Sequence, residues 1–396
     1  MKVRISLAAM AIAALVAAGC GSSKSSSSAS SAAASSGTTT QAASSGSSKS
    51  CAATIGIEAP ITGQVAVLGD EQLAFAQLAV AADNKLNGTN ITLVQGDTQL
   101  NPAQATTVTQ QFTSNSKMVA VVGPAGSQEV QAVGPLFGRA GMAFISGSAT
   151  NPTLTTSGKN PTFFRVVSRD DVQGPEDANF VVKTLHPKAL MIVDDQEVYS
   201  TGLVSSMIPV FQKAGIKVDH ESVSQKVTDF SSLVAKVTPE TTVVVLPWQV
   251  AANGEQFGKD LQQEHKTATI VGTDGMQSSS FTIPGSYVSA FGPDITAIPQ
   301  DAALVAAAKV KYPKFGTFGP PVYAATHVID QAIASVCKSG QTPSRANVLA
   351  AIKTTDEPTS VLGQPIKFDS KGDMINAKWF LFHINSAGKY VLVTNS

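Results

Sequence analysis

Hydroxyl groups crowd one short turn of the sequence. The stretch FISGSATNPTL, residues 144–154, leaves an apolar run for six small or polar residues, 146–151, and restarts at a proline. Here Ser148, Ala149 and Thr150 combine hydroxyls with backbone N–H groups that no bulky side chain covers. Such groups suit an anion, because a small side chain lets a carboxylate approach the backbone closely. We therefore expect this turn to seat a ligand's carboxylate.

Other polar and aromatic residues follow strand-like runs elsewhere in the chain. Ser127 follows VVGPAG, Tyr199 follows IVDDQEV, Trp248 and Gln249 follow VVVLP, and Asp274 follows IVGT. Taken singly, a serine or threonine in a turn is commonly a helix cap. As a set, these residues offer hydroxyls for an anion, and a carboxylate with aromatic rings for a cation and an apolar group. Ligands of open parallel sheets bind at such strand ends.

Short β-branched runs alternate with longer amphipathic runs, which predicts an α/β fold. ATIGIEA, NITLVQGD, MVAVVGP and MAFIS have the pattern of buried strands, and the runs between them have helical spacing. The alternation restarts after FFRVV, residues 163–167, with ALMIVDD, KVDHESVS, TTVVVLPW and ATIVGTD. Repeated β-α units predict parallel sheets covered by helices on both faces. A chain of 396 residues suits two such doubly wound lobes.

The C-terminal part does not continue this simple order. Helical patterns at 299–310, 322–336 and 346–353 precede the β-rich IKFD, KWFLFHI and KYVLV. We expect the chain to cross between the lobes more than once, which would make a multi-crossing hinge. The predicted first lobe comprises residues 51–167 and 292–362, and the predicted second lobe comprises residues 168–291 and 363–396.

The N-terminus has the pattern of an export signal. Lys2 and Arg4 precede an apolar run at 5–18, which is shorter than the roughly 20 residues that span a bilayer. This predicts a signal peptide at residues 1–19. The small residues before Cys20 resemble the bacterial lipoprotein box, although Ala17 stands where leucine is more common. That resemblance implies cleavage before Cys20 and lipidation of its thiol; an ordinary signal peptide is the alternative.

A tether and a cysteine pair follow. Residues 20–50 comprise the lipidated cysteine and a Ser/Ala/Gly-rich segment with the composition of a flexible linker. We therefore predict an exported protein, anchored by lipid to the outer face of the cell membrane or in the periplasm. The two later cysteines, Cys51 and Cys337, predict a disulfide in an exported chain, with two unpaired thiols as the alternative.

Residues 54–394 resemble periplasmic binding proteins of the leucine/isoleucine/valine type, which deliver amino acids to ABC importers. The motifs that carry this resemblance occur in the order IGIEAPITG, VVGPAGS, SATNPTL, FFRVVSRDDVQGP, VDDQEVYSTG, GTDG and FDSKGD. The resemblance implies the type I fold of these proteins. It also implies an extracytoplasmic substrate-binding lipoprotein that binds an amino acid, branched-chain or otherwise aliphatic, in a cleft between the lobes.

The resemblance also assigns roles to single residues. The ligand's carboxylate would be bound by Ser127 and Thr150, with backbone groups of Ser148 and Ala149. Its α-ammonium would be bound by Asp274 and Tyr199. The pocket for its side chain would be shaped by Leu68, Trp248 and Phe318. Asp274 replaces the glutamate of the best-known relative and keeps its charge. A buried acid favours an amine-bearing ligand, because an unpaired buried carboxylate is costly. A small amide or an aromatic carboxylate remains the alternative ligand, and ligand sensing for a separate receptor remains the alternative role.

Composition and motifs argue against a nucleic-acid-binding protein and against an enzyme. Lys+Arg and Asp+Glu each total 28, so there is no net basic charge to recruit nucleic acid. The sequence lacks a Walker A loop, GxGxxG after a strand, HExxH and GxSxG. Its five histidines are scattered, and a hydrolase that used Ser127 would need a histidine partner that no motif supplies. We expect no enzyme activity, no cofactor and no metal, and a monomer whose partners are its ligand and a permease.

Overall fold

The computed structural model describes residues 51–395. The predicted signal peptide, Cys20 and the whole predicted tether lie outside the described residues, so lipidation stays a prediction. Among residues 51–395, no helix combines the length and the hydropathy needed to cross a membrane.

The first sheet is built from five parallel strands. Their order across the sheet is β2-β1-β3-β4-β5. The strands are β1 (Ala52–Ala59), β2 (Asn90–Asp97), β3 (Met118–Val122), β4 (Ala143–Ser146) and β5 (Phe163–Arg165). The first four were predicted, because β-branched runs bounded by turn residues are a strong strand signal, whereas β5 was not predicted as a strand.

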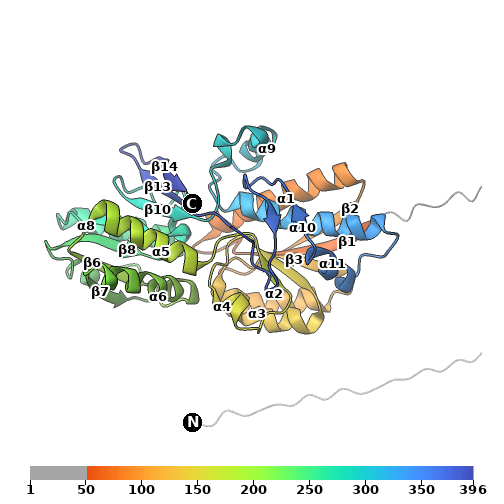
Figure 1. The fold of residues 1–396 in the computed structure, drawn as a ribbon, viewed down its shortest axis with the longest axis horizontal. Helices are drawn as coiled ribbons and strands as arrows, with labels where there is room; N and C mark the ends of the chain where they lie inside the picture. Colours follow the sequence, from red (N-terminus) through yellow and green to blue (C-terminus); the bar gives the residue numbers. More distant parts are fainter. Residues whose placement is uncertain (1–50, 396) are drawn as a thin grey trace, which may run out of the picture. The chain divides into compact units, whose positions relative to one another are not determined.

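Helices cover both faces of this first sheet (Figure 1). The helices are α1 (Ala66–Asn87), α2 (Pro102–Ser114), α3 (Ser127–Ala140), the one-turn α4 (Thr153–Thr156), α10 (Gly319–Lys338) and α11 (Arg345–Ile352). Ile55 and Ile57 of β1 pack with α1, α10 and α11, whereas Met118 and Val121 of β3 pack with α2 and α3. Alternate residues of a strand point to opposite faces, so each face has its own core.

The second sheet has seven strands and mixed direction. Its order is β14-β13-β10-β9-β8-β6-β7, with antiparallel pairing where β10, β13 and β14 meet. Its strands are β6 (Ala189–Asp194), β7 (Lys217–Ser222), β8 (Thr241–Leu246), β9 (Thr269–Gly272), β10 (Tyr287–Ala290), β13 (Phe380–Ile384) and β14 (Tyr390–Asn395). The sequence analysis missed β10, whose sequence YVSA contains only one β-branched residue.

Helices also cover the two faces of the second sheet. They are α5 (Asp170–Phe180), which continues as a π-helix (Val181–Leu185), α6 (Val198–Lys213), α7 (Ser231–Val234) and α8 (Ala251–Gln263). Leu190 and Ile192 of β6 pack with α6, and Met191 and Val193 pack on the side of α7 and α8. The connection between β7 and β8 contains only the single helical turn of α7.

The chain passes between the two sheets more than once (Figure 1). It leaves the first sheet after β5, and α10 and α11 return to that sheet after β10 of the second. It then forms β13 and β14 at the edge of the second sheet. We use "first lobe" and "second lobe" for the parts built on the two sheets. The boundaries proposed at residues 168, 292 and 363 stay predictions.

Short elements complete the described chain. They are α9 (Ala302–Lys311), the two-stranded pair β11 (Asp356–Glu357) and β12 (Ile366–Lys367), and 3-10 turns at Asp274–Met276, Ile295–Ala297 and Pro299–Asp301. Cys51, just before β1, and Cys337, near the end of α10, are joined in a disulfide across 286 residues of sequence. The disulfide therefore links the C-terminal end of α10 to the start of β1, although the two elements are far apart in the sequence.

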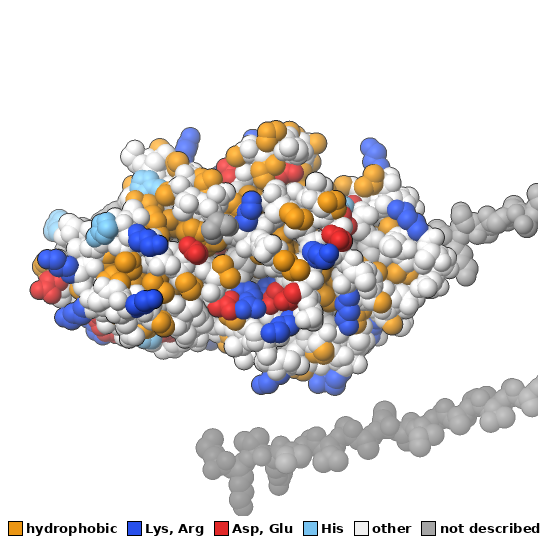
Figure 2. All heavy atoms as spheres, in the orientation of Figure 1, with side chains coloured by type: hydrophobic (Ala, Val, Ile, Leu, Met, Phe, Trp, Pro, Cys, Tyr) orange, Lys and Arg blue, Asp and Glu red, His pale blue; other side chains and the backbone are white. Residues whose placement is uncertain are grey.

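Charged side chains of both signs are scattered over the face shown in Figure 2, and no continuous basic area covers it. This distribution agrees with the equal totals of basic and acidic residues.

Candidate functional site

Asp274 is the central charged group of the site. It follows β9 and begins a 3-10 turn, so it lies at the carboxyl end of a parallel strand. Its side chain is buried, and its Oδ1 accepts hydrogen bonds from the Tyr199 hydroxyl at 2.8 Å and from Gln173 Nε2. The Thr273 hydroxyl lies 2.6 Å from the Tyr199 hydroxyl. Asp274 and Tyr199, which were predicted to bind the ligand's α-ammonium, therefore contact each other directly, and their role in binding stays a prediction.

Burial affects the protonation of Asp274. It raises the pKa of this carboxyl to about 6, although the hydrogen bonds from Gln173 and Tyr199 oppose the shift. No basic side chain pairs with Asp274 in the described part of the chain. A cation placed beside it would therefore stabilise the ionised form, and an ammonium group is a suitable partner.

The turn at residues 146–151 is organised by the Ser146 hydroxyl. Ser146 Oγ accepts from the backbone N–H of Ser148 at 3.2 Å and of Ala149 at 2.9 Å, and donates to the carbonyl of Pro124 at 2.7 Å. The predicted role of these two N–H groups as carboxylate donors needs correction, because Ser146 already accepts from both. The small residues let the turn close on a hydroxyl of its own.

Two hydroxyls of the first lobe can act as donors. Ser127 is the first residue of α3, and its Oγ accepts from the Asn151 backbone N–H at 3.2 Å, which leaves its own proton free. The Thr150 side chain is fully buried, and its hydroxyl lies beside the buried carboxyl of Asp170, where it opposes the rise that burial causes in the pKa of that carboxyl. This hydroxyl can donate to a ligand oxygen only in place of Asp170.

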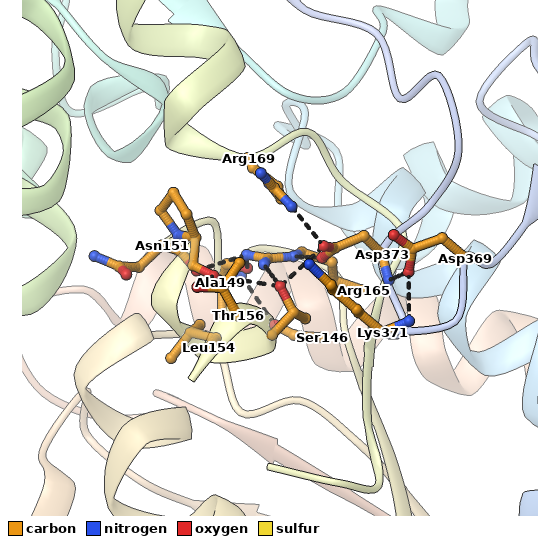
Figure 3. Close-up of polar contacts among 12 residues, drawn as sticks. Ser146, Ala149, Asn151, Leu154, Thr156, Arg165, Arg169, Asp369, Lys371 and Asp373 are labelled. Carbon is orange, nitrogen blue, oxygen red and sulfur yellow. Dashed lines mark hydrogen bonds and ion pairs between the residues drawn. The ribbon is translucent and has the colours of Figure 1, made fainter. Parts of the chain in front are cut away.

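Arg165 contacts the same turn through its guanidinium group (Figure 3). Its side chain is fully buried at the end of β5, and its Nη1 donates to the carbonyls of Ala149 at 3.1 Å and Asn151 at 2.9 Å. Its Nε donates to Asp373 Oδ1 at 2.6 Å, and Arg169 donates to the other oxygen of Asp373 at 2.9 Å. The motifs FFRVVSRDD and FDSKGD thus meet at one buried ion-pair network, 208 residues apart in sequence.

A small cavity lies between these groups. It has a volume of about 20 Å³, enough for roughly one water molecule. Its lining combines Leu68, Leu100, Ala125, Ser148 and Phe318 from the first lobe with Tyr199, Gln249, Asp274 and Gly275 from the second. The cavity thus has a polar side with Asp274 and an apolar wall from the first lobe.

Side chains of the two lobes also contact each other around the cavity. Gln128 Nε2 donates to Gln249 Oε1 at 2.8 Å, and Asn151 Nδ2 donates to the Val198 carbonyl at 2.8 Å. These contacts bring α3 and the turn at 146–151 against the strand ends of the second sheet. In this structure the lobes are therefore closed on each other.

The sequence model of the family described as periplasmic binding protein matches residues 52–389. This chain belongs to that family. The matched region contains the described residues at the cavity and both sheets. Periplasmic binding proteins of this family are exported substrate-binding proteins of ABC transporters and are not enzymes, so the hydrolase alternative is discarded.

Individual relatives are distant but cover most of this periplasmic binding protein. A leucine-, isoleucine-, valine-, threonine- and alanine-binding protein from Pseudomonas aeruginosa is 28% identical over 337 residues, which are 81% of this chain and 87% of the relative. At this identity the relative supports the family and leaves the ligand of this protein open.

Solved structures share the fold. A branched-chain amino acid transporter substrate-binding protein from Streptococcus pneumoniae, in complex with isoleucine, has a TM-score of 0.76 and 24% identity, over 86% of this chain and 99% of that one. A solute-binding protein of an ABC transporter from R. palustris, in complex with benzoate, has a TM-score of 0.77 and 19% identity, over 87% and 96%. The fold therefore accommodates ligands of different classes.

The prediction for Trp248 needs correction in this binding protein. Its side chain lies in the core of the second lobe, in contact with Phe230 and Phe257, and its Nε1 donates to the Val193 carbonyl at 2.7 Å. The next residue, Gln249, lines the cavity instead. The large apolar ring is buried in the core, while the polar amide faces the ligand side.

The structure brings together part of the predicted set and adds members. Ser148, Tyr199, Asp274 and Phe318 line the cavity, and Leu68 lies beside them. Ser127, Ala149 and Thr150 are buried at the turn without lining this small cavity. Sequence reasoning missed Gln173, because it lies inside α5 and reaches Asp274 across 101 residues of sequence. No local pattern marks such a contact.

Proposed function

We propose that this protein binds an α-amino acid between its two lobes and delivers it to the permease of an ABC importer. The observation that carries the proposal is Asp274, a buried carboxylate that contacts Tyr199 and has no basic partner among the described residues. The ammonium of an amino acid would supply the missing charge. The hydroxyls of Ser127 and Thr150 would bind the carboxylate of the same ligand.

The side chain of the ligand would lie against the apolar wall. Leu68, Leu100, Ala125 and Phe318 line the cavity, and Phe318 is held edge-to-face against Phe291 with ring centroids 5.1 Å apart. Such a wall favours a branched-chain or other aliphatic side chain. The cavity is too small for an amino acid as it stands, so binding requires the lobes or the lining side chains to move apart first.

Three further features belong to the proposal on the basis of sequence. Cys20 would carry the lipid anchor, and residues 20–50 would tether the two lobes to the membrane. The protein would act as a monomer, with its closed form recognised by the permease. Membership of a family of transporter components supports delivery to a permease over sensing for a separate receptor.

A ligand screen tests the proposed function. The full-length protein is unfolded and refolded with its disulfide intact, to remove carried-over ligand, and its melting temperature is measured with L-amino acids, their 2-oxo analogues, small amides and aromatic acids. Amino acids should raise the melting temperature, and their 2-oxo analogues should not, because a 2-oxo acid has no ammonium for Asp274. Stabilisation by aromatic acids or amides alone would contradict the assigned ligand class while leaving the fold and family intact.

The affinity for an amino acid should fall as the pH drops below about 6. Asp274 has a pKa raised to about 6 in the free protein, and the ammonium requires its ionised form, so binding must release a proton below that pH. The loss should approach about tenfold per pH unit and should vanish above pH 7. Burial raises the pKa of the neighbouring Asp170 to about 8, so this carboxyl stays largely protonated near pH 6, and burial also raises the pKa of Asp177.

Isothermal titration between pH 4.5 and pH 8 measures this dependence. The variant Asp274→Asn should bind weakly and should lose the decline in affinity that Asp274 causes below about pH 6, so the difference between the two profiles isolates the contribution of Asp274. An affinity for the wild-type protein that is flat from pH 8 to pH 5 would contradict the assignment of the ammonium to this carboxylate.

A further inference from the structure

The second lobe presents an oriented amide to the cavity. Gln249 lies between β8 and α8, is 8% exposed and lines the cavity. Its Oε1 accepts from Gln128 Nε2 at 2.8 Å and from Gln225 Nε2 at 3.2 Å, and its backbone N–H donates to Asp195 Oδ2 at 3.3 Å. Two donors on the oxygen fix the orientation of the amide plane. The Gln249 Nε2 group, on the opposite side, has no acceptor among the described residues.

The first lobe supplies an acceptor beside it. Gln128 is the second residue of α3, is 4% exposed, and its Oε1 is buried without a hydrogen-bond donor in the described chain. Gln128 does not itself line the cavity, but its amide is hydrogen-bonded to the cavity-lining Gln249 at 2.8 Å, so its Oε1 lies beside that residue. The Gln249 amide therefore interrupts the apolar wall, and the unpaired Gln128 oxygen lies next to it.

These two groups match an uncharged polar group better than an apolar or a charged one. A wholly aliphatic side chain would leave both the Gln249 amide nitrogen and the Gln128 oxygen unpaired after closure, which is costly for buried polar atoms. A carboxylate would lie close to the buried Asp195, which accepts from Gln225 Nε2 at 3.1 Å. An ammonium on the ligand's side chain would be repelled by Gln249 Nε2, because both groups carry only donor hydrogens. A hydroxyl or carboxamide both donates and accepts.

We propose that Gln249 and Gln128 select an amino acid whose side chain has an aliphatic body and ends in a hydroxyl or a carboxamide. This inference rests on the proposed function, because it assumes that Asp274 and the hydroxyls of the first lobe hold the ligand's α-groups. It differs from the purely aliphatic expectation for the side chain. Threonine, asparagine or glutamine would be preferred over valine, leucine or methionine, which have similar shapes and lack the polar group.

Matched ligand pairs test the proposal. The dissociation constants of threonine and valine, asparagine and leucine, and glutamine and methionine are measured by titration with the refolded full-length protein. In at least one pair the polar member should bind about tenfold more tightly or better. The variant Gln249→Leu should bring that ratio close to one, because it removes the amide and keeps an apolar side chain. Gln128→Leu should also bring the ratio of dissociation constants closer to one, and it replaces Gln249→Leu in the test if that variant does not fold.

A matched control is available on the neighbouring helix. Gln262 of α8 is exposed and makes no side-chain hydrogen bond within the described residues. Gln262→Leu should keep the wild-type ratio for every pair. Equal or tighter binding of the apolar member in all three pairs would overturn the selection by Gln249 and Gln128 while supporting amino-acid binding. A polar preference that survives both Gln249→Leu and Gln128→Leu would also overturn it. Binding of no amino acid would overturn the proposed function, and this inference with it.

Discussion

Asp274→Ala should weaken amino-acid binding by about tenfold to about a hundredfold. The substitution removes the only carboxylate that lines the cavity, and a hydrogen bond to a charged group contributes roughly 1.5 to 3 kcal/mol. Titration of the refolded variant with the ligand found in the screen measures the effect. The 2-oxo analogue should bind the variant no worse than the wild type, because it makes no ammonium contact.

The control is an acid that lies away from the cleft. Asp219 of β7 is exposed, so Asp219→Ala should bind the amino acid as the wild type does. An unchanged affinity in Asp274→Ala would discard the ammonium assignment and would favour a ligand without an amine.

Replacement of Asp274 should weaken binding but should stabilise the free protein. Burial raises the pKa of Asp274 from 3.8 in the unfolded chain to about 6 in the folded protein. Above pH 6 the buried carboxylate is ionised and lowers the stability of the free protein. This destabilisation decreases below pH 6 and is absent below pH 3.8, where the carboxyl is protonated in both states. Asp274→Asn should therefore raise the melting temperature of the free protein at pH 7 while it weakens binding. This opposition is expected of a binding residue and not of a structural one.

Arg165→Ala should destabilise the protein by about 3 to 5 kcal/mol, the largest effect on folding that we expect from a single substitution. Arg165 is fully buried and donates to Asp373, so its removal leaves a buried carboxylate that only Arg169 and Thr155 still contact. The carbonyls of Ala149 and Asn151 lose their donor as well. Urea unfolding followed by far-UV circular dichroism measures the change, and ligand affinity should fall because the turn at 146–151 loses its support.

An exposed ion pair provides the control for Arg165. Lys259 contacts Glu255 one turn away on α8 at 3.3 Å and is largely exposed, so Lys259→Ala should cost no more than about 0.5 kcal/mol. The double variant Arg165→Met with Asp373→Leu should be less destabilised than the sum of the single variants, because no isolated charge remains. A small effect of Arg165→Ala, similar to that of Lys259→Ala, would show that the network does not support the fold.

The sequence by itself determined the two-sheet fold and the chemistry of the site. β-branched runs such as MVAVV specified buried strands because no other regular structure buries them so well, and Ser127, Tyr199 and Asp274 follow the carboxyl ends of such runs in the sequence. The two cysteines after the tether also predicted the disulfide, which the structure contains. These features depend on local patterns along the chain.

Tertiary structure alone decided which side chains meet. Trp248 and Gln249 are neighbours in sequence, and only the packing of Phe230 and Phe257 shows that the ring enters the core while the amide faces the cavity. Likewise, the pairing of Arg165 with Asp373 joins residues that are 208 positions apart, and the short turn at 146–151 proved to bond to its own Ser146 hydroxyl. Contacts between distant segments depend on how sheets and helices pack, and the residue types along one segment do not specify them.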